Sequence, residues 1–266
     1  MRYFKAKVAY DGTNFAGFQW QREQRTVQAT LETAVARISA GHSRVTAAGR
    51  TDAGVHALGQ VVSFGAQTSV PLNRMTHAMN GGLPPDVSVR FVDEVDAQFS
   101  ARFSASSRVY GYLALNRRCP EALMRRYSAF VPEDLDLAAM QLAGSRLLGE
   151  HCFRAFANEL GAEEHGMRRL MDCRVRRRGR FVCFRIEANA FLRGMARTIV
   201  GTLLEIGAGK RDPSCAADLL RLGDRRLAGP SAPAQGLYLV RARYGSRVDY
   251  SAGRNMCAEE QEGHRE

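Results

Sequence analysis

The sequence predicts an α+β fold in which two related α/β halves share one central mixed or antiparallel sheet, with helices on the outer face. The first observation is that strand-like segments are interspersed with segments of helical period. The second is that the order strand, helix, strand, strand, helix, strand in the first half is followed by a similar order in the second, without obvious sequence repetition. The chain has 266 residues and 45% hydrophobic residues, which suits one large domain or two smaller ones.

The first half contains four predicted strands and two helices. Thr26 is positioned to cap a helix whose apolar residues recur every three or four positions. Pro71 starts a second, shorter helix that runs to Met79. The expected strands are residues 3–10, 44–48, 58–65 and 87–92, and residues 80–86 form a turn-rich connection.

The loop over residues 13–21 contains the aromatic residues Phe15, Phe18 and Trp20 among amide side chains. Exposed aromatics in a loop can stack on nucleic-acid bases or fill an interface. Packing into the core is the more common role of aromatic residues, and we expect it for at least two of the three.

The second half contains predicted strands at 108–115, 181–187 and 237–242, with helices at 135–148 and 191–206. We expect an N-terminal subdomain over residues 1–104 that carries the loop 49–57, and a C-terminal subdomain over 105–247. Residues 248–266 lack an apolar period, which predicts a disordered tail.

The chain is strongly basic, with a net charge of +11, and only three of its 38 basic residues are lysines. Arginine binds phosphate through two hydrogen bonds and stacks on bases, so the composition favours a nucleic-acid partner. A compositional bias of the whole proteome would give the same charge. The run 174–180 is a candidate hairpin in which Arg176, Arg177 and Arg178 could contact phosphates, or form a solvated tip.

Several classes of protein are disfavoured. The apolar stretches are too short to span a membrane, and the N-terminus has no apolar signal segment, so we expect a cytoplasmic protein. The six cysteines form no C-x-x-C pair, and the six histidines form no ligand cluster. We therefore expect no metal and no membrane association.

The loop 49–57 places an arginine, a carboxylate and a histidine between glycines, directly before a predicted strand. The charged carboxylate of Asp52 costs free energy at this place unless it is paired with an opposite charge or has a function. The alternative is an ordinary polar turn, because Asp-Ala-Gly is common turn composition. His56 is expected to have a structural role.

The helix predicted at 192–206 is apolar almost all round, which indicates burial. Arg193 and Arg197 are expected on one of its faces, and a buried arginine needs an anion. Asp52 is the best candidate, although an arginine near the surface could instead extend to solvent. On the strand 108–115, Tyr110 and Tyr112 share a face, where they could stack a base or simply pack in the sheet.

These segments together resemble the tRNA pseudouridine synthase A family. The loop 49–56 is similar to the catalytic motif of that family. Further similarity covers residues 3–245 in the order of the family: 10–13, 17–21, 26–28, 80–86, 103–105, Arg108-x-Tyr110-x-Tyr112, 188–192 and 236–239.

The resemblance implies a pseudouridine synthase-like fold that isomerises uridine in the tRNA anticodon stem-loop, at positions 38, 39 and 40. It implies no cofactor, and a homodimer. Asp52 would be the catalytic carboxylate and Arg197 its ion-pair partner. Arg50 would displace the target base, Tyr110 would stack on the flipped uracil, and Leu237 would form a pocket wall.

Three places depart from the family pattern. Ala196 stands where valine is common, Cys152 stands where aspartate is common, and the C-terminal tail has no counterpart. None of them removes a group assigned to catalysis. A non-catalytic basic RNA-binding or chaperone protein is the alternative function, and it predicts that Asp52 is dispensable.

Overall fold

The computed structural model describes residues 1–41, 43–158 and 165–245. The strands are β1 (Arg2–Tyr10), β2 (Thr46–Ala47), β3 (His56–Ala66), β4 (Val87–Glu94), β5 (Ala105–Asn116), β6 (Ala129–Val131), β7 (Gly149–Cys152), β8 (Met167–Arg178), β9 (Phe181–Ala188) and β10 (Leu237–Tyr244). The helices are α1 (Val27–Ala36), α2 (Leu72–Asn80), α3 (Leu137–Arg146), α4 (Met195–Gly207) and α5 (Cys215–Leu222). Short 3-10 turns lie at Arg154–Phe156, Arg225–Leu227 and Ala234–Gly236.

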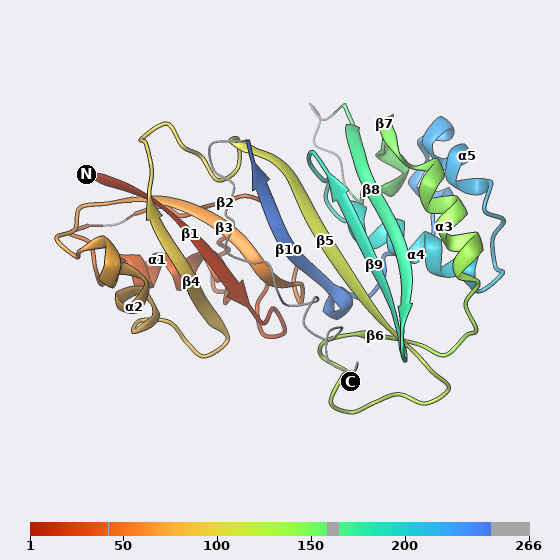
Figure 1. Ribbon diagram of the computed structural model, residues 1–266, viewed down its shortest axis with the longest axis horizontal. Coiled ribbons are helices and arrows are strands. Elements are labelled where there is room, and N and C mark those ends of the chain that lie inside the picture. The colour runs from red at the N-terminus through yellow and green to blue at the C-terminus, as the bar shows by residue number, and fades with distance from the viewer. Residues whose placement is uncertain (42, 159–164, 246–266) are drawn as a thin grey trace, which may run out of the picture.

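All ten strands belong to one sheet, in the order β4-β1-β3-β10-β5-β9-β8-β7, with β2 beside β3 and β6 beside β5 (Figure 1). The pairings β10–β3 and β5–β6 are parallel, and the other pairings are antiparallel. The predicted α+β class with a mixed sheet is therefore confirmed. Helices α1 and α2 lie with the N-terminal strands, and α3, α4 and α5 lie with the C-terminal strands (Figure 1).

Strand β10 joins the two halves, because it lies between β3 and β5. It is antiparallel to β5 from Leu237 to Tyr244, and it pairs with β3 only through Tyr238 and Leu239. The division into 1–104 and 105–247 stays a prediction, since one sheet runs through both halves. Residues 248–266 lie outside the described residues.

The first half has the predicted order of elements, and Thr26 caps α1 by accepting a hydrogen bond from the Ala29 amide. The strand expected at 44–48 is only Thr46–Ala47. In the second half the sequence did not predict β6, β7, α5 or the first part of β8. Elements β6 and β7 have three and four residues, too few to show a period.

The helix predicted from residue 191 or 192 begins later, at Met195. Gly194 precedes it in the left-handed conformation, with φ of 76°, which a helix cannot continue through. Arg193 therefore lies in the loop before α4 and not on the helix face, which corrects that expectation. The predicted burial is confirmed, because ten of the thirteen α4 residues are buried.

The hairpin predicted at 174–180 is confirmed. Strand β8 ends at Arg178, β9 begins at Phe181, and Gly179 turns the chain with φ of 54°. No helix among the described residues is long and apolar enough to cross a membrane.

The packing of α4 against the loop after Ala228 leaves no room for a side chain at residue 201. A Cβ atom on Gly201 would lie 1.8 Å from the Pro230 carbonyl oxygen. We expect Gly201→Ala to lower the free energy of unfolding by about 1–3 kcal/mol, because overpacking displaces backbone. Urea unfolding followed by circular dichroism measures this.

Gly81→Ala is the matched control, since its φ is −61° and the nearest atoms to its Cβ are 3.6 and 3.7 Å away. It should change stability by less than about 0.5 kcal/mol. Equal stability of the two variants would contradict the close approach of α4 to Pro230.

Candidate active site

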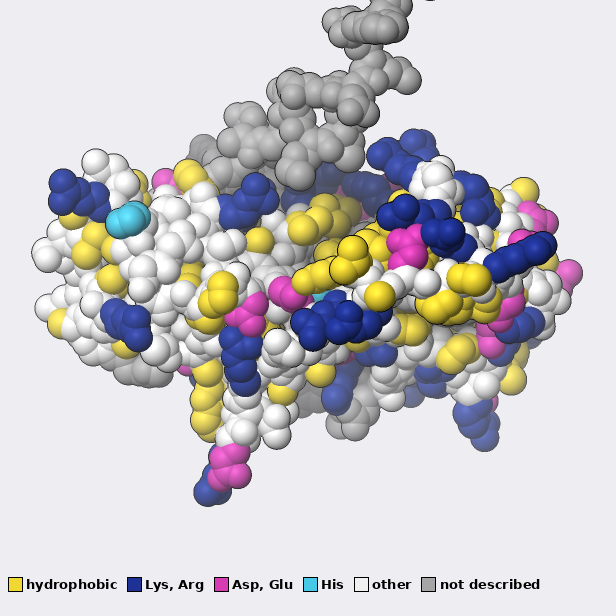
Figure 2. Space-filling model, turned by 90° about the horizontal axis from the view of Figure 1, so that it is seen from below, with side chains coloured by type: hydrophobic (Ala, Val, Ile, Leu, Met, Phe, Trp, Pro, Cys, Tyr) yellow, Lys and Arg dark blue, Asp and Glu magenta, His cyan; other side chains and the backbone are white. Residues whose placement is uncertain are grey.

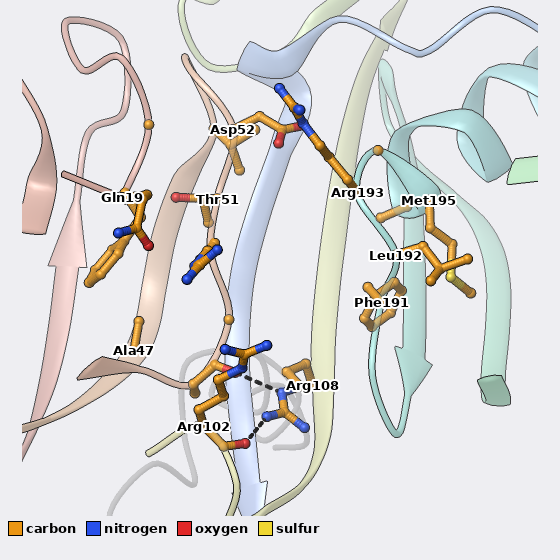
Figure 3. A pocket seen from close by; sticks show the side chains of 18 of the residues that line it. Gln19, Ala47, Thr51, Asp52, Arg102, Arg108, Phe191, Leu192, Arg193 and Met195 are labelled. Carbon is orange, nitrogen blue, oxygen red and sulfur yellow. Dashed lines mark hydrogen bonds between the residues drawn. The ribbon is translucent and has the colours of Figure 1, made fainter. Parts of the chain in front are cut away.

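A cleft of about 1270 Å³ opens where the two halves of the sheet meet. Its walls come from the loops 16–21 and 44–55, from residues 102–110, from the segment 190–197 and from Leu237 at the start of β10. Figure 3 shows side chains from these segments facing one another across the cleft, with Asp52 towards one end and Arg102 and Arg108 towards the other.

Five residues singled out from the sequence line this cleft: Arg50, Asp52, Tyr110, Arg197 and Leu237. They come from the loop before β3, from β5, from α4 and from β10. The structure thus brings together side chains that lie up to 187 positions apart in the chain (237 − 50 = 187).

The loop that carries Asp52 is held by hydrogen bonds on both sides. The Thr51 hydroxyl lies 2.8 Å from the Tyr10 hydroxyl, and the Thr51 carbonyl accepts from the Phe18 amide at 2.9 Å. The Gly49 carbonyl accepts from Nε2 of Gln60 at 2.6 Å. Strands β1 and β3 therefore position the Asp52 backbone before any ligand binds.

Asp52 forms an ion pair with Arg197. An Nη1 of Arg197 lies 3.3 Å from Oδ2 of Asp52, and the two side chains are 21% and 33% exposed. Nε of Arg197 donates to the Ala232 carbonyl at 2.7 Å, which fixes the direction of the guanidinium. The ion pair engages Oδ2, so the lone pairs of Oδ1 remain available in the cleft that Asp52 lines. The alternative in which Arg197 extends only to solvent is wrong.

Tyr110 forms part of the cleft floor and is 6% exposed. Its ring contacts the Phe191 ring edge-on, with centroids 4.8 Å apart. Burial raises the pKa of Tyr110 well above its ordinary value, and the charges of Tyr10 and Asp52 raise it further. The phenol is therefore neutral at physiological pH and can donate a hydrogen bond into the cleft.

Arg108 connects the segments that form the end of the cleft opposite Asp52. Its guanidinium donates to the carbonyls of Ala48 at 2.9 Å, Ala105 at 3.1 Å and Asn189 at 2.7 Å, and also to the carbonyl of Arg102. The residue is 8% exposed, and burial lowers the pKa of its guanidinium, which nevertheless stays charged. One side chain thus ties together the catalytic loop, the start of β5 and the loop after β9.

The charge in the cleft is strongly one-sided. Asp52 is the sole carboxylate among the described residues that line it. Seven arginines line the same cleft: Arg44, Arg50, Arg102, Arg108, Arg168, Arg193 and Arg197. Low-dielectric walls with one sign of charge raise the local concentration of an oppositely charged ligand. The cleft is suited to a polyanion that brings one reacting group to Asp52.

Arg50 is exposed at the cleft, whereas Arg176, Arg177 and Arg178, near the turn of the β8–β9 hairpin, do not line it. Arg176, Arg177 and Arg178 are exposed, and Arg177 donates to Asn116 at 2.8 Å. Figure 2, which looks at the end of the sheet where β8 meets β9, shows basic side chains grouped beside hydrophobic ones. Phosphate binding by this hairpin stays a prediction.

His56 is buried and fully engaged behind the catalytic loop. Its Nδ1 accepts from the Gly12 amide at 3.0 Å, and Nε2 lies 2.8 Å from the Arg126 carbonyl. Its ring stacks on Tyr238 with centroids 4.9 Å apart. This is the structural role that the sequence predicted, because a histidine with both nitrogens bonded to protein is not directed at a ligand.

The role of Arg108 was not predicted from the sequence, although the residue belongs to the Arg108-x-Tyr110-x-Tyr112 pattern. The available signal was a charged residue on the same face of the strand as Tyr110. The expectation for the loop 13–21 is confirmed, since Phe15 and Phe18 are buried and Trp20 is 54% exposed. Across the described ranges, no group of three or more His, Cys, Asp or Glu side chains could hold a metal ion.

Comparison with known proteins identifies the family. The model of the tRNA pseudouridine synthase family matches residues 6–104 and 143–245. The chain belongs to this family. It is 44% identical to tRNA pseudouridine synthase A of Geobacillus kaustophilus over 90% of this chain and 93% of that protein. It is 41% identical to tRNA pseudouridine synthase A of Syntrophomonas wolfei over 92% of this chain and 98% of that protein. It is 44% identical to the protein of the same name from Halalkalibacterium halodurans over 97% of this chain and 98% of that protein.

The hydrogen bonds of Arg108 predict a large effect on stability. Arg108→Met keeps the length of the side chain but leaves several buried carbonyls without a donor. We expect the free energy of unfolding to fall by at least about 2 kcal/mol, because hydrogen bonds from a charged donor are lost. Urea unfolding measures the change.

Arg241→Met is the matched control, because Arg241 is exposed on β10 and outside the cleft. Its stability should stay within about 0.5 kcal/mol of the parent. A similarly small change in the free energy of unfolding for Arg108→Met would contradict the prediction. It would show that water replaces the hydrogen bonds of Arg108 without loss of stability.

Proposed function

We propose that this protein isomerises uridine to pseudouridine in tRNA, at positions 38, 39 and 40 of the anticodon stem-loop. The proposal rests on Asp52, which among the described residues is the single carboxylate in a cleft lined by seven arginines. The arginines suit the phosphates of an RNA, and the carboxylate suits chemistry at a ribose carbon. The named relatives, each a tRNA pseudouridine synthase A, support the same reaction.

The reaction breaks the bond between uracil N1 and ribose C1′, rotates the uracil and forms a bond from C5 to C1′. The proton on C5 is lost and N1 gains a proton, so product and substrate are isomers and no redox partner is required. Asp52 can attack C1′, stabilise an oxocarbenium-like centre, or remove a proton from C2′. Its ion pair with Arg197 at 3.3 Å orients the carboxylate for each of these roles.

The uridine must leave its stack before Asp52 can reach C1′, which costs a few kcal/mol. Arg50 is exposed, and it precedes Asp52 by two positions, so it is suited to take the place of the displaced base. Tyr110 offers a neutral ring and a hydroxyl to the detached uracil, and Leu237 provides an apolar wall. Together these residues would hold the uracil while it rotates.

The proposed partner is tRNA, and the proposed location is the cytoplasm, where this substrate is processed. No cofactor is needed for the isomerisation. A homodimer is proposed from the family that the sequence resembles. In the described part of the chain the cleft already contains the five residues assigned to it, so a second copy would extend the RNA-binding surface.

We expect Asp52→Asn to abolish pseudouridine formation, because an amide can neither attack C1′ nor accept a proton at neutral pH. Asparagine keeps the size of the side chain, so binding of tRNA should change by less than about threefold. Mass-spectrometric mapping of an unmodified tRNA transcript after incubation measures product, and filter binding measures affinity.

Asp134→Asn, which alters an exposed carboxylate outside the cleft, is the matched control and should retain full activity. Product from purified Asp52→Asn at the rate of the parent would refute the proposal. That result would favour the non-catalytic RNA-binding protein, in which only the basic surface matters.

The β8–β9 hairpin provides an independent prediction. Replacing Arg176, Arg177 and Arg178 by glutamine should weaken tRNA binding if they contact phosphates. Each lost contact should flatten the slope of log affinity against log salt concentration by about 0.7–0.9. Binding measured over a range of salt concentrations tests this, and unchanged affinity and slope would identify the hairpin as a solvated tip.

A further inference from the structure

Phe103 is an exposed aromatic residue at the active-site cleft. It lines the cleft next to Arg102, and 80% of it is accessible to solvent. A single exposed apolar residue is common on protein surfaces. This one differs because it faces a highly charged cleft, where an apolar ring offers nothing to phosphates but can stack on a base.

The backbone just before Phe103 is held by hydrogen bonds. The preceding Ala101 is fully buried, its amide donates to the Ser63 hydroxyl at 3.0 Å, and its carbonyl accepts from the Tyr244 hydroxyl at 2.9 Å. The carbonyl of Arg102 accepts from the buried Arg108. These hydrogen bonds fix the backbone from which the exposed ring of Phe103 projects.

Arg102 places a positive charge beside the exposed ring. Its guanidinium lies 5.1 Å from the centroid of Phe103, and its side chain is exposed. A ring that stacks on a base and an adjacent arginine that reaches the phosphate form the usual combination for binding single-stranded nucleic acid. The same arrangement would be unfavourable for a hydrophobic protein partner, since the arginine would lose its hydration.

We propose that Phe103 and Arg102 form a second nucleobase subsite, which stacks an unpaired RNA base other than the target uridine. Arg102 and Asp52 lie towards opposite ends of the cleft in Figure 3, so a base on Phe103 is not the base at Asp52. The subsite rests on the proposed function in that its ligand is the same RNA. It gives the enzyme a contact with the loop beyond the target nucleotide.

Arg108 links this subsite to the catalytic loop. The same guanidinium donates to the carbonyl of Arg102 and, at 2.9 Å, to that of Ala48. One buried side chain therefore links the backbone next to Phe103 to the start of the loop that carries Asp52. Through this link the subsite favours RNA loops in which the stacked base and the target uridine are separated by a set distance.

The test uses anticodon-arm hairpins that each carry the fluorescent base 2-aminopurine at one loop position. Stacking on an aromatic ring quenches this base, so binding of the parent protein should quench it most strongly at one position other than the target. Phe103→Ala should abolish that quenching. It should also raise the Kd of the hairpin about 5- to 150-fold, as expected for the loss of one base–aromatic stack.

Phe103→Trp should restore both the quenching and the affinity, because tryptophan also stacks. Phe130→Ala is the matched control, since Phe130 is 40% exposed on β6 and outside the cleft, and its Kd should match that of the parent. In tRNA modification, the effect of Phe103→Ala should fall on KM more than on kcat.

Quenching at the same position by Phe103→Ala, with an unchanged Kd, would overturn the subsite. A change in oligomeric state without loss of quenching would also overturn it, in favour of a protein contact. The fluorescence measurement requires binding and no turnover. Absence of pseudouridine in the parent reaction would therefore refute the proposed function. The fluorescence result would still decide whether Phe103 stacks on a base.

Discussion

The site depends on the pairing of β10 with two strands that come from different halves of the chain. Strand β10 runs beside β5 over its whole length and touches β3 through only Tyr238 and Leu239. Asp52 precedes β3, whereas Tyr110 lies on β5 and Arg197 on α4. Asp52 and these residues therefore lie in one cleft because β10 joins the two parts of the sheet between them.

Charge provides the second constraint. A lone carboxylate among seven arginines is stabilised without any of them binding it tightly, and the arginines in turn attract phosphates. Arg197 contacts Asp52 at 3.3 Å, while Arg108 uses backbone carbonyls and contributes its charge at the other end. The same set of cations thus pairs with Asp52, shapes the walls of the cleft and attracts an anionic ligand.

Much of this arrangement could be predicted from the sequence, because long elements carry clear periods and the loop 49–57 has an unusual composition. The order of elements in the first half, the buried α4 and the pairing of Asp52 with Arg197 were all predictable. The start of α4 was not, since it depends on the left-handed Gly194. The role of Arg108 was not either, because its partners are carbonyls, which every residue has and which leave no trace in the sequence.

The central position of β10 also determines when the sheet can be completed during synthesis of the chain. The residues of β10 are synthesised after every other described strand, yet they lie in the middle of the sheet. Until β10 has been synthesised, β3 and β5 cannot be joined through it, although β2 pairs with β3 and β6 with β5. The complete sheet, and with it the cleft around Asp52, therefore requires the chain to be synthesised as far as Tyr244.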